Sequence, residues 1–386
     1  MVIWMVLALA AGVVRGQGEN GRLRIVFGGD IMGHSTLVAS GLQTDGSYDF
    51  EPCFEYVRDY IESADLAVAN LEVTLAGKPY TSYPYFSSPD ALALAARNVG
   101  FDIVTTANNH CLDKGKAGLE RTLAVLDSLG MKHLGTYMDE EAREREHPLM
   151  VEKNGIRMAL LTYTYGCNGF VASRPNVVNL TDTAVMRKDL EKAHALGADF
   201  VVTMMHWGIE YEVRGNGEQV RLAKWLMNNG SNIVIGGHPH VVQNLSADIN
   251  PLNDRHPEIV VFSMGNLLSN QRDVNTDGGI MVELRLKKDE LGTRVESCYY
   301  FPYWVNRYTV NKRRYYRIVP ARDGMANPKA YGLSKEAQGG LKRFVTNLDR
   351  RIEDSRPEKM MEGEGFGWFE ERTFYQNGKP KEDARN

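Results

Sequence analysis

The chain has 386 residues, of which 43% are hydrophobic, enough to bury one large core or two modest ones. Its 45 basic and 49 acidic residues give a formal net charge of −4, and the sequence has no long basic block. These values are ordinary for a globular protein and argue against a protein that binds nucleic acid by neutralising its phosphates. We therefore expect no nucleic-acid partner.

The first seventeen residues, MVIWMVLALAAGVVRGQ, contain an apolar run that is too short to span a bilayer. Its length suits the hydrophobic region of a signal peptide, although such a peptide normally begins with basic residues and here Arg15 follows the run. We expect residues 1–20 to be a signal peptide or leader of a protein exported to the periplasm or cell surface. An uncleaved membrane anchor and a truncated start are the alternatives.

The four cysteines are widely scattered and show no CxxC spacing, which excludes a zinc knuckle and a dense disulfide framework. They are Cys53, Cys111, Cys167 and Cys298. In an oxidising compartment one disulfide remains possible.

After the leader, apolar runs of strand length alternate with stretches of helical period, the order expected when helices cover the faces of β-sheets. The predicted strands are 22–30, 65–70, 101–108, 199–207, 231–238 and 258–266, and the predicted helices are 87–100, with a Ser N-cap, 115–130 and 181–197. Asn154-Gly155 between two apolar runs predicts a hairpin within 149–165, so the sheets should be mixed. Strands at 278–288 and 295–310 and a helix at 334–355 follow.

Side chains that can bind metal stand where the predicted strands end, which is where ligands bind in α/β sheets. They are Asp30, His34, Glu72, Asn109, His110, His206, His238 and His240. Carboxylate, amide oxygen and imidazole together suit Zn²⁺, Mn²⁺ or Fe better than Ca²⁺. We therefore expect one or two divalent transition-metal ions as cofactor.

Each of these residues also has an ordinary structural interpretation. Asp30 and Glu72 can serve as caps or surface carboxylates, His206 as a buried core histidine, and His34 as a turn residue before a helix. The segment GGHPHVV, which contains His238 and His240, is harder to explain in this way, because its glycines allow close backbone approach and Pro239 fixes the chain between two imidazoles. The joint occurrence of all these motifs favours a site.

Six motifs occur in order: GGDIM, ANLEVTLAG, TTANNHCLDKGKAGLERTLAVLDSLGMKHLGT, MMHWGIEYE, GGHPHVVQ and FSMGNLLSNQ. As a set they resemble the CapA family, the capsule and poly-γ-glutamate synthesis proteins within the calcineurin-like metallophosphoesterase superfamily. The resemblance implies an α/β fold, a four-layer α/β/β/α sandwich with mixed sheets, over residues 23–290. Residues 291–355 are then expected to pack on this domain as strands and a helix, and 356–386 to form a flexible tail.

The resemblance also implies roles for individual residues. Glu72 looks like a carboxylate that bridges two metals, Asn109, His206 and His238 look like ligands of the second metal, and Asp30 and His240 look like ligands of the first. His110 looks like the catalytic residue that faces the substrate and stabilises or protonates the leaving oxygen. A helix beginning near Gly115 would point its partly positive N-terminus toward an anionic substrate.

Two positions depart from the superfamily pattern. The usual Asp-x-His of the first motif has Met32 in the place of the histidine, and His34, two residues further on, is a possible substitute. Asn70-Leu71-Glu72 replaces the usual Gly-Asp pair of the second motif. These departures put the number of metals and the bridging role of Glu72 in question.

Two functions from different classes fit these observations. The first is a metal-dependent hydrolase that acts outside the cytoplasm on a phosphoester or on an anionic polymer linkage such as a γ-glutamyl amide. A metal-bound water needs no nucleophilic Ser or Cys, and the chain has no G-x-S-x-G elbow or P-loop. The second is a non-catalytic, metal-bearing factor that binds and helps to assemble or transport an anionic capsular polymer, in contact with synthesis or export machinery at the membrane.

The segment 299–316 is rich in aromatic and basic residues and suggests a docking surface for an acidic polymer. The alternative that we favour is an antiparallel strand pair packed on the sheet edge, with its Lys and Arg side chains in solvent.

Overall fold

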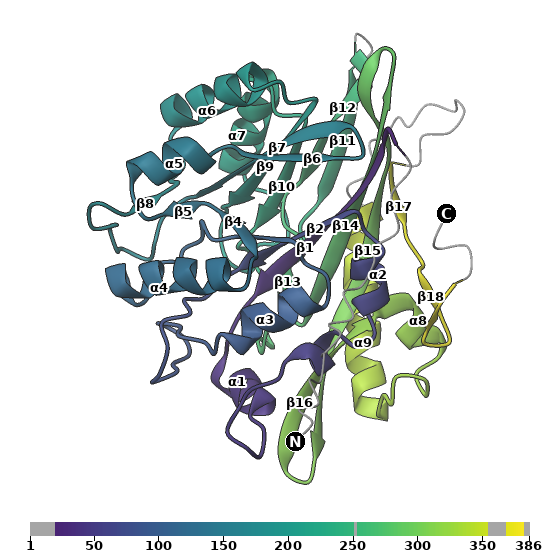
Figure 1. The fold of residues 1–386 in the computed structure, drawn as a ribbon. Helices are drawn as coiled ribbons and strands as arrows, with labels where there is room; N and C mark the ends of the chain where they lie inside the picture. The colour runs from purple at the N-terminus through teal and green to yellow at the C-terminus, as the bar shows by residue number, and fades with distance from the viewer. Residues whose placement is uncertain (1–19, 251–252, 354–367, 382–386) are drawn as a thin grey trace, which may run out of the picture.

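The computed structural model describes residues 20–250, 253–353 and 368–381, and two mixed β-sheets form its centre (Figure 1). The first sheet has the order β16 (Arg313–Pro320), β15 (Gly292–Val310), β14 (Gly278–Asp289), β1 (Arg22–Ile31), β2 (Leu66–Leu71), β3 (Ile103–Thr105) and β4 (Lys132–Leu134), with β13 (Asn266–Leu268) beside β1 and β17 (Trp368–Glu371) beside β15. The second has the order β11 (Leu245–Asn250), β12 (Asn253–Val261), β10 (Ile233–Gly237), β9 (Phe200–His206), β7 (Ile156–Thr164) and β6 (Leu149–Lys153).

Helices connect and cover these strands. They are α1 (Ser35–Gly41), the 3-10 turn η1 (Glu51–Phe54), α2 (Arg58–Glu62), α3 (Ala91–Asn98), α4 (Gly115–Ser128), α5 (Glu140–Glu146), α6 (Thr183–Ala195), α7 (Gly217–Asn228), α8 (Ala321–Ala326) and α9 (Lys335–Glu353). Two small strand pairs, β5 (Thr136–Tyr137) with β8 (Val177–Val178) and β18 (Tyr375–Gln376) with β19 (Lys379–Pro380), complete the described part of the chain.

Three apolar cores separate four layers. Alternate residues of a strand face opposite sides of its sheet, so Ile25 packs between the two sheets while its neighbour Val26 faces the first helical layer. The inner core joins both sheets, the second core joins the first sheet to α1 and α3, and the third joins the second sheet to α6 and α7. Figure 1 shows the two helical layers on opposite sides of the sheets. The predicted four-layer sandwich is confirmed.

Most predicted elements are present. The hairpin turns at Asn154 and Gly155 with φ of 52° and 78°, as a two-residue turn of type I′ requires, and α4, α6 and α9 lie within the predicted helices. The predicted Ser cap of the helix at 87–100 is wrong, because α3 begins at Ala91 after Asp90. The Ser88 side chain is instead buried, and its Oγ has no hydrogen-bond partner among the described residues. A Cβ added to Gly33 would clash with this Oγ.

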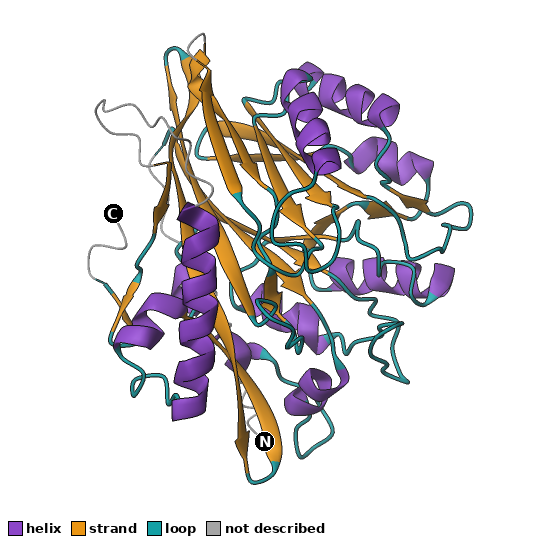
Figure 2. Ribbon diagram, turned by 180° about the vertical axis from the view of Figure 1, so that it is seen from behind, coloured by secondary structure: helices purple, strands orange, loops and turns teal. Residues whose placement is uncertain are grey.

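The C-terminal strands continue the first sheet rather than forming a separate one. β15 pairs with β14 on one side and β16 on the other, and the apolar face of α9 joins the inner core through Leu341, Phe344 and Leu348 (Figure 2). Of the tail that we expected to be flexible, residues 368–381 include β17, which pairs with β15. Residues 1–19 of the leader predicted at 1–20, and the segment 354–367, lie outside the described residues. Within those residues no helix is both long and apolar enough to cross a membrane.

Candidate metal centre

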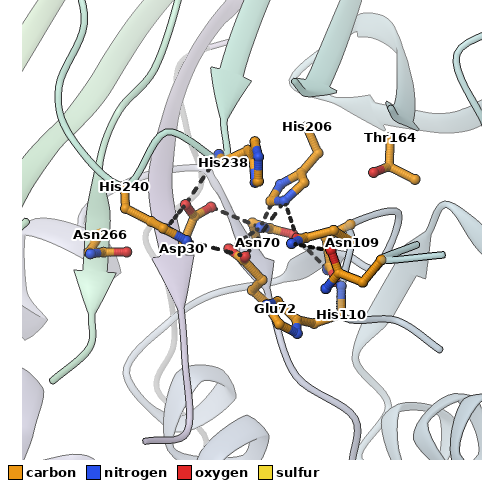
Figure 3. A network of polar contacts seen from close by, with 12 residues as sticks. Asp30, Asn70, Glu72, Asn109, His110, Thr164, His206, His238, His240 and Asn266 are labelled. Carbon is orange, nitrogen blue, oxygen red and sulfur yellow. Dashed lines mark hydrogen bonds and ion pairs between the residues drawn. The ribbon is translucent and has the colours of Figure 1, made fainter. Parts of the chain in front are cut away.

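The candidate site lies where strands of both sheets end. Asp30 is paired with Asn70 across β1 and β2, and Glu72 follows β2 directly. In the second sheet, His206 ends β9 opposite Gly237, the last residue of β10. The remaining side chains come from the loops after β3 and β10, and they are Asn109, His110, His238 and His240. Residues that are far apart in sequence and come from both sheets therefore form one buried cluster (Figure 3).

Glu72 occupies the middle of this cluster, as Figure 3 shows. Its Oε1 lies 3.6 Å from His206 Nε2 and 3.8 Å from His240 Nε2. Asp30 Oδ2 lies 3.3 Å from His240 Nδ1, and His206 Nε2 lies 2.8 Å from Asn109 Oδ1. All six residues predicted as ligands are thus brought together, and each is at most 3% exposed.

Two groups within the cluster have ligand atoms that all lie within 4.8 Å of one another. One contains Asp30, Glu72 and His206, and the other contains Glu72, His238 and His240. Glu72 belongs to both, as a bridging carboxylate would. In these groups Asp30 shares a potential metal site with His206, whereas the family resemblance assigns Asp30 and His240 to the same metal.

Asn70 holds this arrangement together, although we predicted no role for it in the site from the sequence. Its Nδ2 donates to Asp30 Oδ1 at 2.8 Å and lies 3.4 Å from His206 Nδ1. Its Oδ1 accepts from Thr105 Oγ1 at 3.0 Å and from Asn108 Nδ2 at 3.2 Å. An amide at the end of an otherwise apolar strand, Leu66–Leu71, was the available signal.

The loop after β10 has an unusual backbone that suits its place in the site. His238 and His240 have φ of 93° and 58°, a region that non-glycine residues rarely occupy and that is often found at functional sites. Gly236 must lack a side chain, because a Cβ there would come within 2.0 Å of Phe262 O. The glycines therefore let β10 approach its neighbours closely enough for the two imidazoles to reach Asp30 and Glu72.

Burial without a cation makes this cluster electrostatically costly. Burial, followed by the nearby Asp30 carboxylate, raises the pKa of Glu72 well above its usual value. Burial, followed by the neighbouring His240, lowers the pKa of His238 to about 3, and burial with His238 lowers that of His206 strongly. Burial alone would raise the pKa of Asp30, but hydrogen bonding to His240 and the charges of His206 and His240 outweigh burial, so the pKa is lowered.

A divalent cation would remove this cost, and the residues fit one. Glu72 Oε1 and His238 Nδ1 are buried and have no hydrogen-bond partner among the described residues, and His240 Nδ1 has only the Asp30 carboxylate nearby, at 3.3 Å. Buried polar atoms are nearly always satisfied in folded proteins, so two orphaned atoms in one cluster indicate a missing ligand. The mixture of carboxylate, amide and imidazole is the donor set of Zn²⁺, Mn²⁺ or Fe.

His110 lies beside the ligand cluster but is held by a different residue. Its Nδ1 is 2.8 Å from Asp113 Oδ2, which also accepts from the backbone N–H of Phe86 at 2.7 Å. The Phe86 ring meets the imidazole edge-on with centroids 4.8 Å apart. Asp113 was not identified from the sequence, although its i,i+3 spacing from His110 within one turn was a usable signal. These contacts orient the ring and leave Nε2 without a hydrogen-bond partner in the described structure.

Comparison with known proteins identifies the family. A family model described as "Bacterial capsule synthesis protein PGA_cap" matches residues 24–271, more than half of the chain. The chain belongs to this family. The resemblance seen in the six motifs is therefore confirmed.

Two curated relatives are each 26% identical to this family member. "Capsule biosynthesis protein CapA" of Bacillus anthracis matches over 286 residues, 70% of this chain and 65% of the relative. "PGA biosynthesis protein CapA" of Bacillus subtilis matches over 252 residues, 62% of each chain. The chain spans less than two thirds of the length of either relative.

Two solved structures are also similar to this capsule synthesis family member. NAD nucleotidase (NadN) of Haemophilus influenzae has a TM-score of 0.47 at 12% identity, over 86% of this chain and 63% of that one. The calcineurin-like phosphoesterase YfkN of Bacillus subtilis has a TM-score of 0.41 at 13% identity, over 87% and 99%.

The departure at Met32 has a clear structural consequence in this family member. Met32 is 1% exposed and belongs to the core beneath α1 and α3, so it offers no ligand to the site. His34, which we considered as its substitute, stands immediately before α1 and accepts from the backbone N–H of Asn270 at 3.3 Å. Its ring packs edge-on against Phe86, and it belongs to neither group of close ligand atoms.

Exposed aromatic side chains adjoin the histidines of the centre. The Tyr165 ring lies 4.6 Å from the His238 ring and stacks on His206 at 6.5 Å, and Tyr211 lies 6.3 Å from His240. Both tyrosines are more than 40% exposed. Tyr165 follows β7 in a segment without a motif, and Tyr211 lies within the motif MMHWGIEYE but was not singled out, so the fold shows that both belong to the surroundings of the site.

Proposed function

We propose that this protein is a metal-dependent hydrolase that acts on a phosphoester or on an anionic polymer linkage. The observation that supports this most is the convergence of six buried oxygen and nitrogen ligands, with Glu72 shared by two groups, at strand ends of both sheets. A cluster that served only to stabilise the fold would leave no orphaned ligand atoms.

The residues of the chain divide the work in this proposal. Metal ions bound by this donor set would supply an activated water and polarise the scissile group. Glu72, Asp30, Asn109 and the three histidines would hold the ions, and Asn70 fixes the orientations of Asp30 and His206. His110, with Nδ1 held by Asp113, presents Nε2 to the substrate and donates a proton to the leaving oxygen.

Arginines near the site support an anionic substrate. Arg272 donates through Nη1 to Val305 O, while its Nε and Nη2 have no partner among the described residues. Burial, and then the charges of Arg307 and Arg314, lower the pKa of Arg272 to about 10. The Asp277 carboxylate opposes this lowering without reversing it. Arg272, Arg307 and Arg314 therefore form a basic region that would attract phosphate or polymer carboxylates.

The arginine cluster reaches the neighbourhood of the site through a short chain of contacts. Arg272 lies over the Tyr316 ring at 5.9 Å, and Tyr316 donates to Asn270 Oδ1 at 2.5 Å. The backbone of Asn270 in turn contacts His34.

Arg313, which we first considered part of a docking surface, instead bonds the backbone carbonyl groups of Ser40 and Leu42, so its role is structural.

The alternative function is a non-catalytic, metal-bearing factor that binds an anionic capsular polymer and helps its assembly or transport. The observation that favours it is the burial of Met32 in the core, which removes one expected ligand. The names of the two CapA relatives, which refer to capsule and PGA biosynthesis, are compatible with either function. Either function would operate after export, at the periplasm or cell surface.

The test is hydrolysis of an aryl phosphate by the full chain with added Mn²⁺ or Zn²⁺. We expect weak activity that a chelator abolishes and that readdition of metal restores, and the variant His133→Ala, outside the site, should retain it. A parallel assay follows cleavage of poly-γ-glutamate. Binding of this polymer without hydrolysis of either substrate would reject the hydrolase and favour the alternative.

A further inference from the structure

Two cysteines, Cys111 and Cys167, meet beside the metal centre. Their Sγ atoms are 3.7 Å apart, although 56 residues separate them in the chain. They are 7% and 5% exposed and share a small apolar cluster with Leu112, Leu119 and Leu123. The other two cysteines, Cys53 and Cys298, are buried in different cores. The described structure therefore brings one pair of thiols into contact.

Both cysteines lie in segments that form the site. Cys111 follows His110 directly, in the turn after β3 of the first sheet. Cys167 follows β7 of the second sheet and stands between Tyr165, whose ring contacts His238, and Asn168, whose Oδ1 accepts from Asn109 Nδ2 at 3.2 Å. A covalent bond between the two sulfur atoms would join the two sheets at the edge of the metal centre.

The separation of the two sulfur atoms can be closed by a small local movement. A disulfide needs a separation of about 2.05 Å, so the two atoms must approach by less than about 2 Å. Cys111 lies in a turn, and Cys167 lies between Gly166 and Gly169. Neither cysteine is part of a regular helix or strand.

We propose that Cys111 and Cys167 form an intramolecular disulfide that fastens the segment 165–170 to the turn carrying Asn109 and His110. The oxidant is a small disulfide such as glutathione disulfide. The two cysteine thiols lose two protons and two electrons as one S–S bond forms, and the S–S bond of the oxidant breaks to give two thiols. Because both cysteines are nearly buried once folded, the exchange takes place before segment 165–170 closes over the turn.

The bond would make the geometry of the site depend on redox state. In the reduced protein, the contacts that hold segment 165–170 to the turn after β3 include the Asn109–Asn168 hydrogen bond and the packing around Leu112. In the oxidised protein the same segment is anchored covalently, so Tyr165 and Asn168 stay against the ligands. This inference concerns the chain itself and does not depend on the proposed hydrolase activity.

The test begins with the full chain refolded in a glutathione redox buffer, alkylated in denaturant and digested for mass spectrometry with and without a reductant. We expect one reducible cross-link that joins the peptides of Cys111 and Cys167, and alkylated Cys53 and Cys298. The number of free thiols should fall from four to two. Four free thiols, single glutathione adducts without a cross-link, or a cross-link between any other pair would overturn the proposal.

Variants extend the test to the site. Cys111→Ala and Cys167→Ala should each abolish the cross-link, whereas the matched controls Cys53→Ala and Cys298→Ala should retain it. With the wild-type chain loaded with Zn²⁺, we expect slower transfer of the metal to a chelator from the oxidised than from the reduced form, and a higher midpoint of thermal unfolding. Equal transfer rates in a cross-linked protein would refute the fastening of the site.

Discussion

His110 shows how one turn can serve two roles. Asn109 and His110 are adjacent, but Asn109 Oδ1 faces His206 whereas His110 Nδ1 faces Asp113. The Asp113 carboxylate has Oδ2 engaged by both the imidazole and the backbone of Phe86, so its position is fixed. The amide is thus placed to bind metal while the imidazole is placed to move a proton.

Replacing His110 by alanine should separate these two roles. We expect His110→Ala to lower kcat by about 10²–10⁴-fold, the usual contribution of a positioned general acid, while the bound metal per chain is unchanged. Asp113→Asn should lower kcat less, because the ring remains but is less well oriented. Steady-state kinetics with metal analysis of the same samples measure both effects. Full activity in His110→Ala would remove this residue from the mechanism.

Individual ligands were predictable where the sequence restricts the backbone. Two glycines before His238 and a proline between His238 and His240 indicate a loop with a restricted backbone conformation. Both histidines have positive φ values in the structure. Asn70 was missed because it acts through Asp30, which is distant in sequence. Asp113 was missed because it acts through the backbone of Phe86 and through His110 within the same turn. Side-chain geometry, not residue type, distinguishes His34 from the six clustered residues.

Helix α7 stabilises the loops that carry the second-sheet histidines. Asn216 and Gln219 form a capping box at its N-terminus, with N–H to oxygen distances of 3.0 Å in both directions. Gln219 Nε2 also donates to Gln243 Oε1 at 2.9 Å, and Gln243 Nε2 donates to the carbonyl oxygens of Glu212 and Arg214. One helix end therefore connects the segment after His206 with the segment after His240.

Removing this connection should weaken the fold. Gln219→Met keeps the volume of a side chain that is 2% exposed, but it removes the acceptor of the Asn216 backbone N–H and leaves Gln243 Oε1 without its donor. We expect a loss of about 1–3 kcal/mol in the free energy of unfolding, measured by urea denaturation. Glu218→Ala, at the exposed neighbouring position, should change it by less than about 0.5 kcal/mol. Equal effects of the two substitutions would show that the network is dispensable.

At the scale of the whole molecule, a buried ionic cluster joins helices α5 and α6 to strand β7 of the second sheet. Asp189 on α6 accepts from Arg143 of α5 at 2.6 Å and from the Tyr163 hydroxyl of β7 at 2.8 Å, and it lies 3.4 Å from His147 Nε2. Burial alone would raise the pKa of Asp189, but His147 and Arg143 outweigh it and lower the pKa from 3.8 to about 2.

This lowered pKa predicts a specific acid sensitivity. A carboxyl group whose pKa is lower in the folded than in the unfolded state stabilises the fold above the unfolded value, and the contribution is lost as pH falls toward the folded value. The Asp189 contribution should thus be complete above about pH 4 and disappear toward about pH 2. Urea midpoints from pH 5 to 2 should fall less steeply for Asp189→Asn than for the wild type or Glu191→Gln. An unchanged slope would contradict the assignment.

The architecture as a whole followed from the alternation of apolar strands and amphipathic helices, because both sheets must be covered on their outer faces. The family motifs then specified that two sheets pack together. The sequence favoured an antiparallel strand pair on the sheet edge at 299–316, which β15 and β16 confirm, but it did not reveal that β17 pairs with β15 from the far end of the chain. Such pairings depend on contacts between distant segments and leave no local periodic signal.

The central claim, a metal centre shared by the two sheets, is tested most directly by elemental analysis of protein purified without added metal or chelator. We predict about two transition-metal ions per chain, lost in both Glu72→Ala and His238→Ala and retained in His133→Ala. About one ion per chain would mean that only one of the two ligand groups is used, as the burial of Met32 would allow. No bound metal, or the same content in wild type and both site variants, would contradict the account.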